Sequence, residues 1–211
     1  AVLMRHLFSQ AEHLLAEAMG LSATGRDCLL CYRELVLALI DKGVHPGTPQ
    51  AIYGLALMLE RGILFQLPVA PAMWRQLGLP LSDWARERLT LAFGTAVPAE
   101  ALLLEGVLCM LGLPLGVGQG NNPTCQSARA LSMWAYNDPD YLLQMVTWAA
   151  RDDEIIMHFE GQPISSQESL GGVATSLPID LDAVSLLVVP HLDRIYAEMG
   201  RRCIGREGDP H

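Results

Sequence analysis

The sequence predicts a mainly α-helical fold of the α+β class, with a helical front half and a rear half that adds a short strand region. Apolar residues recur at helical spacing through most of the chain, and glycine or proline stands where many of these segments begin or end. Residues 154–159 alternate apolar and polar side chains as a strand does. With 211 residues, of which 51 % are apolar and 18 % charged, the chain is long and apolar enough for a folded core.

The front half contains a series of amphipathic segments that we expect to be helices. Gly20 and Gly43 end the first two segments, because glycine readily adopts the left-handed conformation that follows a helix. Thr48 before Pro49 is typical of a helix start. Three prolines interrupt residues 67–81, which we expect to be a connector. The expected helices span residues 3–20, 27–42, 48–61, 82–93 and 98–112.

The rear half differs from the front half in its composition and in its pattern of apolar residues. Residues 112–123 are rich in Gly, Pro and Asn and predict a loop, and residues 161–176 predict a second loop or a weak hairpin. Pro190 should bend the last helix because it removes a backbone hydrogen-bond donor. The expected rear helices span residues 123–136, 138–151 and 180–203.

The change in composition near residues 112–120 suggests that the chain has two regions. A helical region, 1–112, would precede a mixed α+β region, 113–211, that holds the candidate site; the alternative is a single domain, 1–211. The chain begins at alanine rather than methionine and ends abruptly, so we expect a trimmed product or a piece of a larger protein.

Composition argues against several classes of function. The formal net charge of −9 argues against a nucleic-acid binder, which needs a basic surface. The longest apolar run, residues 106–118, is shorter than the roughly 20 residues of a spanning helix, so we expect no membrane span. The five cysteines are odd in number and scattered, which indicates reduced thiols and a cytoplasmic location. Thirteen of the 14 basic residues are arginine, a bias common in GC-rich bacterial genomes.

The segment around Cys125 offers the clearest candidate for chemistry. A Gly- and Asn-rich loop leads into a predicted helix, with Asn122 expected as N-cap and Pro123 at the first helical position. Cys125 would then lie among unpaired backbone N–H groups at the positive end of the helix dipole. That position favours the thiolate, which is the nucleophilic form of cysteine. Alternatively, the Asn-Asn-Pro-Thr sequence only caps a helix and Cys125 is a small, partly buried residue.

The order of residues in this segment resembles that of papain-like cysteine peptidases. Gln119 precedes Cys125 by six positions, and Cys125 opens a predicted helix that later contains Trp134. Bacteriocin-processing peptidases and transglutaminase-like enzymes are distant relatives with a similar Cys-then-His order. The resemblance implies that Cys125 is the nucleophile, Gln119 an oxyanion donor and His158 the base.

The chain departs from the family's pattern in several ways. Gln126 replaces the aromatic residue that follows the family's cysteine, and the interval from Cys125 to His158 is short. No Asn-Ser-Trp-like segment follows. The resemblance covers residues 119–158 and predicts a cysteine-dependent hydrolase or acyl transferase that acts on a peptide or amide.

His158 and Glu160 lie two residues apart around the end of the predicted strand, so they share a face. Glu160 can therefore orient the imidazole, as a carboxylate does in a catalytic triad. Asp180 and Asp182 are alternative orienting groups. The simpler interpretation is a half-exposed His–Glu pair at a strand end.

Other groups of residues that could bind a ligand or take part in chemistry are better explained by structural roles. We expect no metal site, because the acidic residues near His158 lack a metal-binding spacing, and no cofactor, because no strand precedes the glycines after residue 112. Cys28 and Cys31 have the spacing of a redox pair but lie in a predicted helix, so we expect both in the core. We also expect His191 to be a core or interface residue. The candidate metal ligands considered are Asp152, Asp153, Glu154, His158 and Glu160.

A non-catalytic helical interaction or dimerisation domain is the competing function. The Leu- and Met-rich helices between residues 29 and 67 could hold a partner helix or a second copy of the chain. The expected partner is thus a protein or peptide substrate in the first case, and a partner helix or a homodimer in the second.

Overall fold

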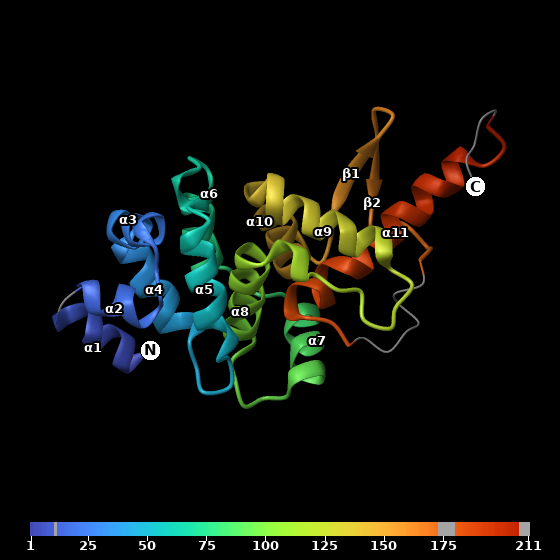
Figure 1. Cartoon of the computed structure of the whole chain (residues 1–211). Coiled ribbons are helices and arrows are strands. Elements are labelled where there is room, and N and C mark those ends of the chain that lie inside the picture. The colour runs from blue at the N-terminus through green and yellow to red at the C-terminus, as the bar shows by residue number, and fades with distance from the viewer. Residues whose placement is uncertain (11, 173–179, 207–211) are drawn as a thin grey trace.

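Figure 1 shows a computed structural model, which describes residues 1–10, 12–172 and 180–206. Over these residues the protein is mainly α-helical with one two-stranded sheet, as the sequence predicts. The front helices are α1 (Val2–Gln10), α2 (Glu12–Ala18), α3 (Ala23–Cys31), α4 (Arg33–Gly43), α5 (Gln50–Glu60), α6 (Val69–Leu77), α7 (Asp83–Phe93) and α8 (Ala99–Gly112). The rear elements are α9 (Cys125–Asn137), α10 (Pro139–Thr147), β1 (Ile156–Phe159), β2 (Gln162–Ser165) and α11 (Ala183–Cys203). The short helices are η1 (Ile63–Phe65), η2 (Pro114–Gly116) and η3 (Trp148–Asp152), of which η3 is a π-helical turn.

The segment 67–81 corrects one prediction, because it contains the helix α6 rather than a connector alone. Pro68 precedes this helix and Pro71 lies in its first turn, where a backbone N–H has no intrahelical partner to lose. Burial of the apolar side chains of Val69, Met73 and Leu77 stabilises the helix.

A further boundary differs from the prediction. The helix expected at 27–42 is two helices, α3 and α4, which meet at Tyr32, whose φ of −114° and ψ of 29° are not helical. Of the two alternatives expected for residues 161–176, a loop or a weak hairpin, the structure shows the hairpin, in which β2 pairs with β1 in antiparallel fashion. Residues 173–176 of that segment lie outside the described part of the chain.

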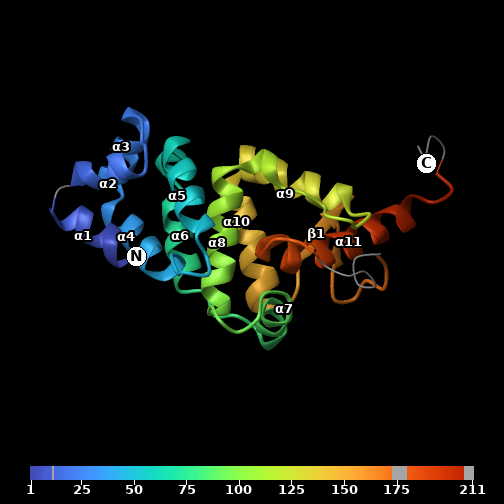
Figure 2. The same cartoon turned by 60° about the horizontal axis from the view of Figure 1, so that its bottom comes forward.

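Helix α8 forms the centre of the molecule. It packs against α4, α5 and α7 from the front half and against α9 and α11 from the rear half. The two views show the helices arranged along one direction, with α1 and α2 at one end of an elongated molecule and the C-terminal part of α11 at the other (Figures 1 and 2). The described helices include none that is both long enough and apolar enough to cross a membrane.

Arg61, which follows α5, connects three helix ends by polar contacts. Its guanidinium donates to the backbone carbonyl of Leu111 at the end of α8 and, at 3.2 Å, to that of Ala135 near the end of α9. It also stacks over the ring of Tyr136, 5.5 Å from the ring centroid. These bonds satisfy C-terminal carbonyl groups that have no partner within their own helices.

Candidate functional site

Cys125 is the first residue of α9 and its side chain is exposed. The helix begins two residues later than predicted, with Thr124 as N-cap in place of Asn122. Cys125 therefore remains in the first helical turn, where backbone N–H groups lack intrahelical partners and the helix dipole is positive. The thiol is accessible to solvent at the end of the helix that stabilises negative charge.

The other cysteines differ from Cys125 in exposure. Cys28 is buried, as expected, whereas Cys31 is exposed, so the prediction that both lie in the core was wrong for Cys31. Cys31 is the last residue of α3, and its position at a helix end lets its side chain reach solvent. Cys109 and Cys203 are partly buried.

The loop before Cys125 is held by hydrogen bonds between side chains and backbone. The Gln119 side-chain amide donates to the backbone carbonyl of Asn122 at 2.7 Å, and the Asn122 amide donates to the carbonyl of Gln119 at 3.1 Å. Asn122 also donates to the Asp180 carboxylate at 3.1 Å. Gly120 has a φ of +57°, and a Cβ at this position would lie 2.5 Å from the Asp180 carboxylate. The network therefore requires glycine at position 120 and joins the loop to the segment before α11.

Asn122 belongs to this network and does not cap α9, which begins three residues later at Cys125. Its side-chain amide is engaged by Gln119 and Asp180, and the side chain is almost fully buried at 4 % exposure. Asp180, considered from the sequence as an orienting group for a histidine, instead positions the loop. Asp182, the other alternative, caps α11 by accepting from Val184 and Ser185.

His158 and Glu160 lie on and next to the β-hairpin. His158 is exposed on β1 opposite Pro163, and Glu160 follows the strand with a φ of +52°. The Arg206 guanidinium donates two hydrogen bonds to Glu160, and these lower the pKa of that carboxyl. No hydrogen bond or ion pair in the described chain joins Glu160 to His158.

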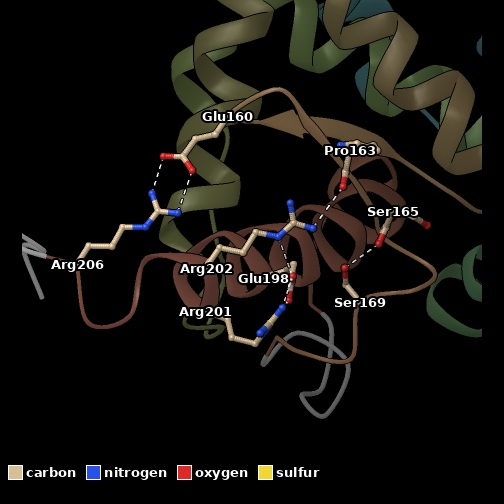
Figure 3. A network of polar contacts seen from close by, with 8 residues as sticks. All are labelled: Glu160, Pro163, Ser165, Ser169, Glu198, Arg201, Arg202 and Arg206. Atoms are coloured by element: carbon tan, nitrogen blue, oxygen red, sulfur yellow. Dashed lines mark hydrogen bonds and ion pairs between the residues drawn. The ribbon is translucent and has the colours of Figure 1, made fainter.

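Figure 3 shows how the hairpin is fastened to the C-terminal part of α11 and the segment after it. Arg202 donates to the carbonyl of Pro163 at 3.3 Å and to Glu198 at 2.9 Å. Arg201 also donates to Glu198, and these two arginines lower the pKa of Glu198 to about 2. The hairpin thus has its own anchor, separate from the network that holds the Cys125 loop.

The predicted site residues therefore fall into two groups. Gln119 and Cys125 occupy one loop–helix junction together with Asp180, whereas His158 and Glu160 belong to the hairpin. No hydrogen bond among the described residues joins the Cys125 sulfur to Gln119, His158 or Glu160.

The sequence reasoning did not identify a buried polar cluster around His191. Ser166 lies 2.8 Å and the Arg194 guanidinium 2.9 Å from His191 Nδ1, while Asp153 lies 3.6 Å from Nε2. Burial, with a smaller contribution from the positive charge of Arg194, lowers the pKa of His191 to about 3. Ser166 is also fully buried and accepts a hydrogen bond from the Ile155 N–H. Serine, histidine and aspartate are the residue types of a catalytic triad, but a substrate cannot reach this serine, so the cluster has a structural role.

The candidate metal ligands are engaged with other side chains. Asp152 pairs with Arg151, Asp153 faces His191, and Glu154 accepts from Ser165. Over residues 1–10, 12–172 and 180–206, no group of three such ligands is arranged to hold a metal ion.

Comparisons with protein-family models, with curated proteins and with solved structures found no match to this chain.

Proposed function

We propose that this protein is a cysteine-dependent hydrolase or acyl transferase that acts on a peptide or amide, with Cys125 as nucleophile. The observation that carries the proposal is the exposed thiol at the first residue of the 13-residue helix α9. A thiolate at this position faces solvent and lies beside backbone N–H groups that have no helical partner.

The same N–H groups suggest how the reaction intermediate would be stabilised. The thiolate attacks the amide carbonyl carbon, which forms a carbon–sulfur bond and places negative charge on the carbonyl oxygen. Backbone N–H donors at the start of α9 can bind that oxygen. The carbon–nitrogen bond then breaks, the amine leaves with a proton from the general acid, and water or another acceptor takes the acyl group from Cys125.

His158 remains the proposed base because it is accessible. Of the two histidines described after residue 112, His191 is fully buried and its lowered pKa keeps it neutral, whereas His158 is exposed on β1. Gln119 acts in this proposal by positioning the loop, since its amide already donates to Asn122. Glu160 has no part in orienting the base while Arg206 holds it.

The second candidate function is a non-catalytic helical interaction or dimerisation domain. It is favoured by large apolar side chains that the described structure leaves exposed, and by the separate anchoring of the hairpin and the Cys125 loop. Examples are Leu67 at 92 %, Leu115 at 82 % and Leu91 at 74 % exposure.

An acyl-transfer experiment separates the two candidates. The protein is mixed with p-nitrophenyl acetate, quenched in acid and mapped by peptide mass spectrometry. We expect an acetyl group on Cys125 and continued release of p-nitrophenolate, both lost in Cys125→Ala and kept in Cys31→Ala, which removes the other exposed thiol. His158→Ala should slow release of the acyl group. Equal turnover in Cys125→Ala and the parent protein would reject the nucleophile and leave the interaction domain, which sedimentation analysis of the oligomeric state then tests.

A further inference from the structure

An apolar pocket of about 280 Å³ lies between α5, α8 and the start of α11. Leu57 on α5, Met110 on α8, and Leu113 and Val117 after α8 supply much of its hydrocarbon lining. Its volume is slightly below the roughly 300–1,000 Å³ typical of drug-sized ligands. The pocket therefore suits a small organic molecule with an apolar body.

Two of the residues that line the pocket are glycines. Gly54 and Gly106 both lie where helices make close contact. A Cβ on Gly54 would lie 2.6 Å from the Cys109 backbone nitrogen, and one on Gly106 would lie 3.2 Å from Val184. The close approach of the helices that surround the pocket thus requires small residues at these two positions.

One acidic residue, Asp182, lies at the edge of the pocket. Asp182 is exposed and lines the pocket, and one of its carboxylate oxygens, Oδ1, is fixed by the N–H groups of Val184 and Ser185, each at 3.0 Å. Cys109 also lines the pocket; burial, followed by the charges of Glu105 and Asp182, raises the pKa of its thiol to about 11. No Lys or Arg is among the described lining residues.

We propose that this pocket binds a small organic cation, an ammonium group attached to an apolar alkyl or aryl body. The ammonium group pairs with Oδ2 of Asp182, which accepts no hydrogen bond from the described residues, whereas Oδ1 is held by the helix cap. The hydrocarbon body packs among Leu57, Met110 and Leu113, where burial removes it from water. Tyr53 also lines the pocket and supplies an aromatic ring, a group that attracts cations. The site does not depend on whether Cys125 is a nucleophile.

Three matched compounds test the class of ligand: hexylamine, 1-hexanol and hexanoate, which share an alkyl chain and differ in charge at neutral pH. Binding is measured by calorimetry and by protection of Cys109 from a maleimide, with Cys31 as an internal control that lies outside the pocket. We expect hexylamine to protect Cys109 and to bind about fivefold more tightly than 1-hexanol, with hexanoate the weakest.

Asp182→Asn isolates the charge, because asparagine is also a good N-cap. This variant should lose the preference for hexylamine over 1-hexanol while 1-hexanol binding changes little. The matched control is Asp27→Asn, which removes the same charge from an exposed residue of α3 outside the pocket lining, and should keep the preference. Unchanged Cys31 reactivity and thermal unfolding would show that each variant is folded. The proposal is overturned if none of the compounds protects Cys109, if hexanoate binds as well as hexylamine, or if Asp182→Asn keeps the preference.

Discussion

Burial determines which histidine of the rear half can take part in chemistry. His191 Nδ1 has Ser166 and Arg194 within hydrogen-bond distance, and because arginine can only donate, Nδ1 must accept. The remaining proton of a neutral ring then lies on Nε2, which faces Asp153. The cluster links α11 to the π-helical turn and to the base of the hairpin. Because the histidine is buried in this cluster, it is difficult to protonate.

This histidine should make the protein sensitive to mild acid. Its folded-state pKa of about 3 lies below the ordinary value of 6.5, so between these pH values the unfolded chain binds a proton that the folded chain does not. The stabilising contribution is complete above pH 6.5 and is lost as the pH falls, at on the order of 1 kcal/mol per pH unit. Urea unfolding at several pH values between these limits measures the slope.

The control is His191→Gln, which cannot titrate. Burial raises the pKa of Asp153, an effect that favours the folded state at lower pH and partly opposes that of His191. For this reason the slopes of the two proteins are compared. We expect a shallower decline for His191→Gln; identical slopes would show that His191 does not control acid stability.

At the scale of elements, the backbones of α5 and α8 make a close contact. A Cβ on Gly54 would lie 2.6 Å from a backbone nitrogen of α8, and one on Gly112 would lie 2.5 Å from the Gly54 carbonyl oxygen. The backbones of the two helices therefore touch, and one methyl group at either glycine would force them apart.

Gly54→Ala should lower the free energy of unfolding by about 2 kcal/mol or more, because the added methyl group overpacks the contact. Gly200→Ala is the matched control, since Gly200 lies in α11 with open space around its Cβ position. It should raise the free energy of unfolding by about 0.5–1 kcal/mol through helix propensity alone. Chemical denaturation of both variants tests the pair, and equal effects would contradict the packing argument.

The elements also show what could be predicted from the sequence. Periodicity and local caps placed most helices, including the helix that Cys125 opens, because these signals involve neighbours in the chain. Helix α6 was not predicted, because a proline such as Pro71 usually interrupts a helix. Pro71 is tolerated in the first turn, but the sequence alone does not show where that turn begins. The loop network could not be predicted, since Asn122 is engaged by Asp180, 58 positions away. Of the partners of His191, Arg194 is only three positions away on the same helix, but Ser166 is 25 positions away, and no local pattern indicates that contact.

At the scale of the whole molecule, α8 packs against both of the regions that the sequence composition suggests, 1–112 and 113–211. Eleven of its 14 residues are buried, and its neighbours come from α4, α5 and α7 on one side of residue 112 and from α9 and α11 on the other. Arg61 adds polar contacts from α5 to the ends of both α8 and α9. The connections favour one cooperative unit over two independent regions.

A fragment that ends at residue 112 should therefore fail to fold on its own. Removal of α9 and α11 would expose the side of α8 on which Gly106 meets Val184, and the fragment should bind a hydrophobic dye and melt without a sharp transition. Co-expression with the rest of the chain should restore cooperative melting. A fragment with a sharp, independent transition would instead support the two-region division.

The reactivity of Cys125 relative to Cys31 shows whether the start of α9 activates its thiol. Both thiols are exposed, but Cys125 begins α9 whereas Cys31 ends α3, so the helix dipoles act on them in opposite directions. Peptide mapping after brief treatment with iodoacetamide at neutral pH gives both rates in one sample. We expect Cys125 to react at least about threefold faster than Cys31, and the two rates to become similar when urea unfolds the protein. Equal rates in the folded protein would show that the helix does not activate Cys125.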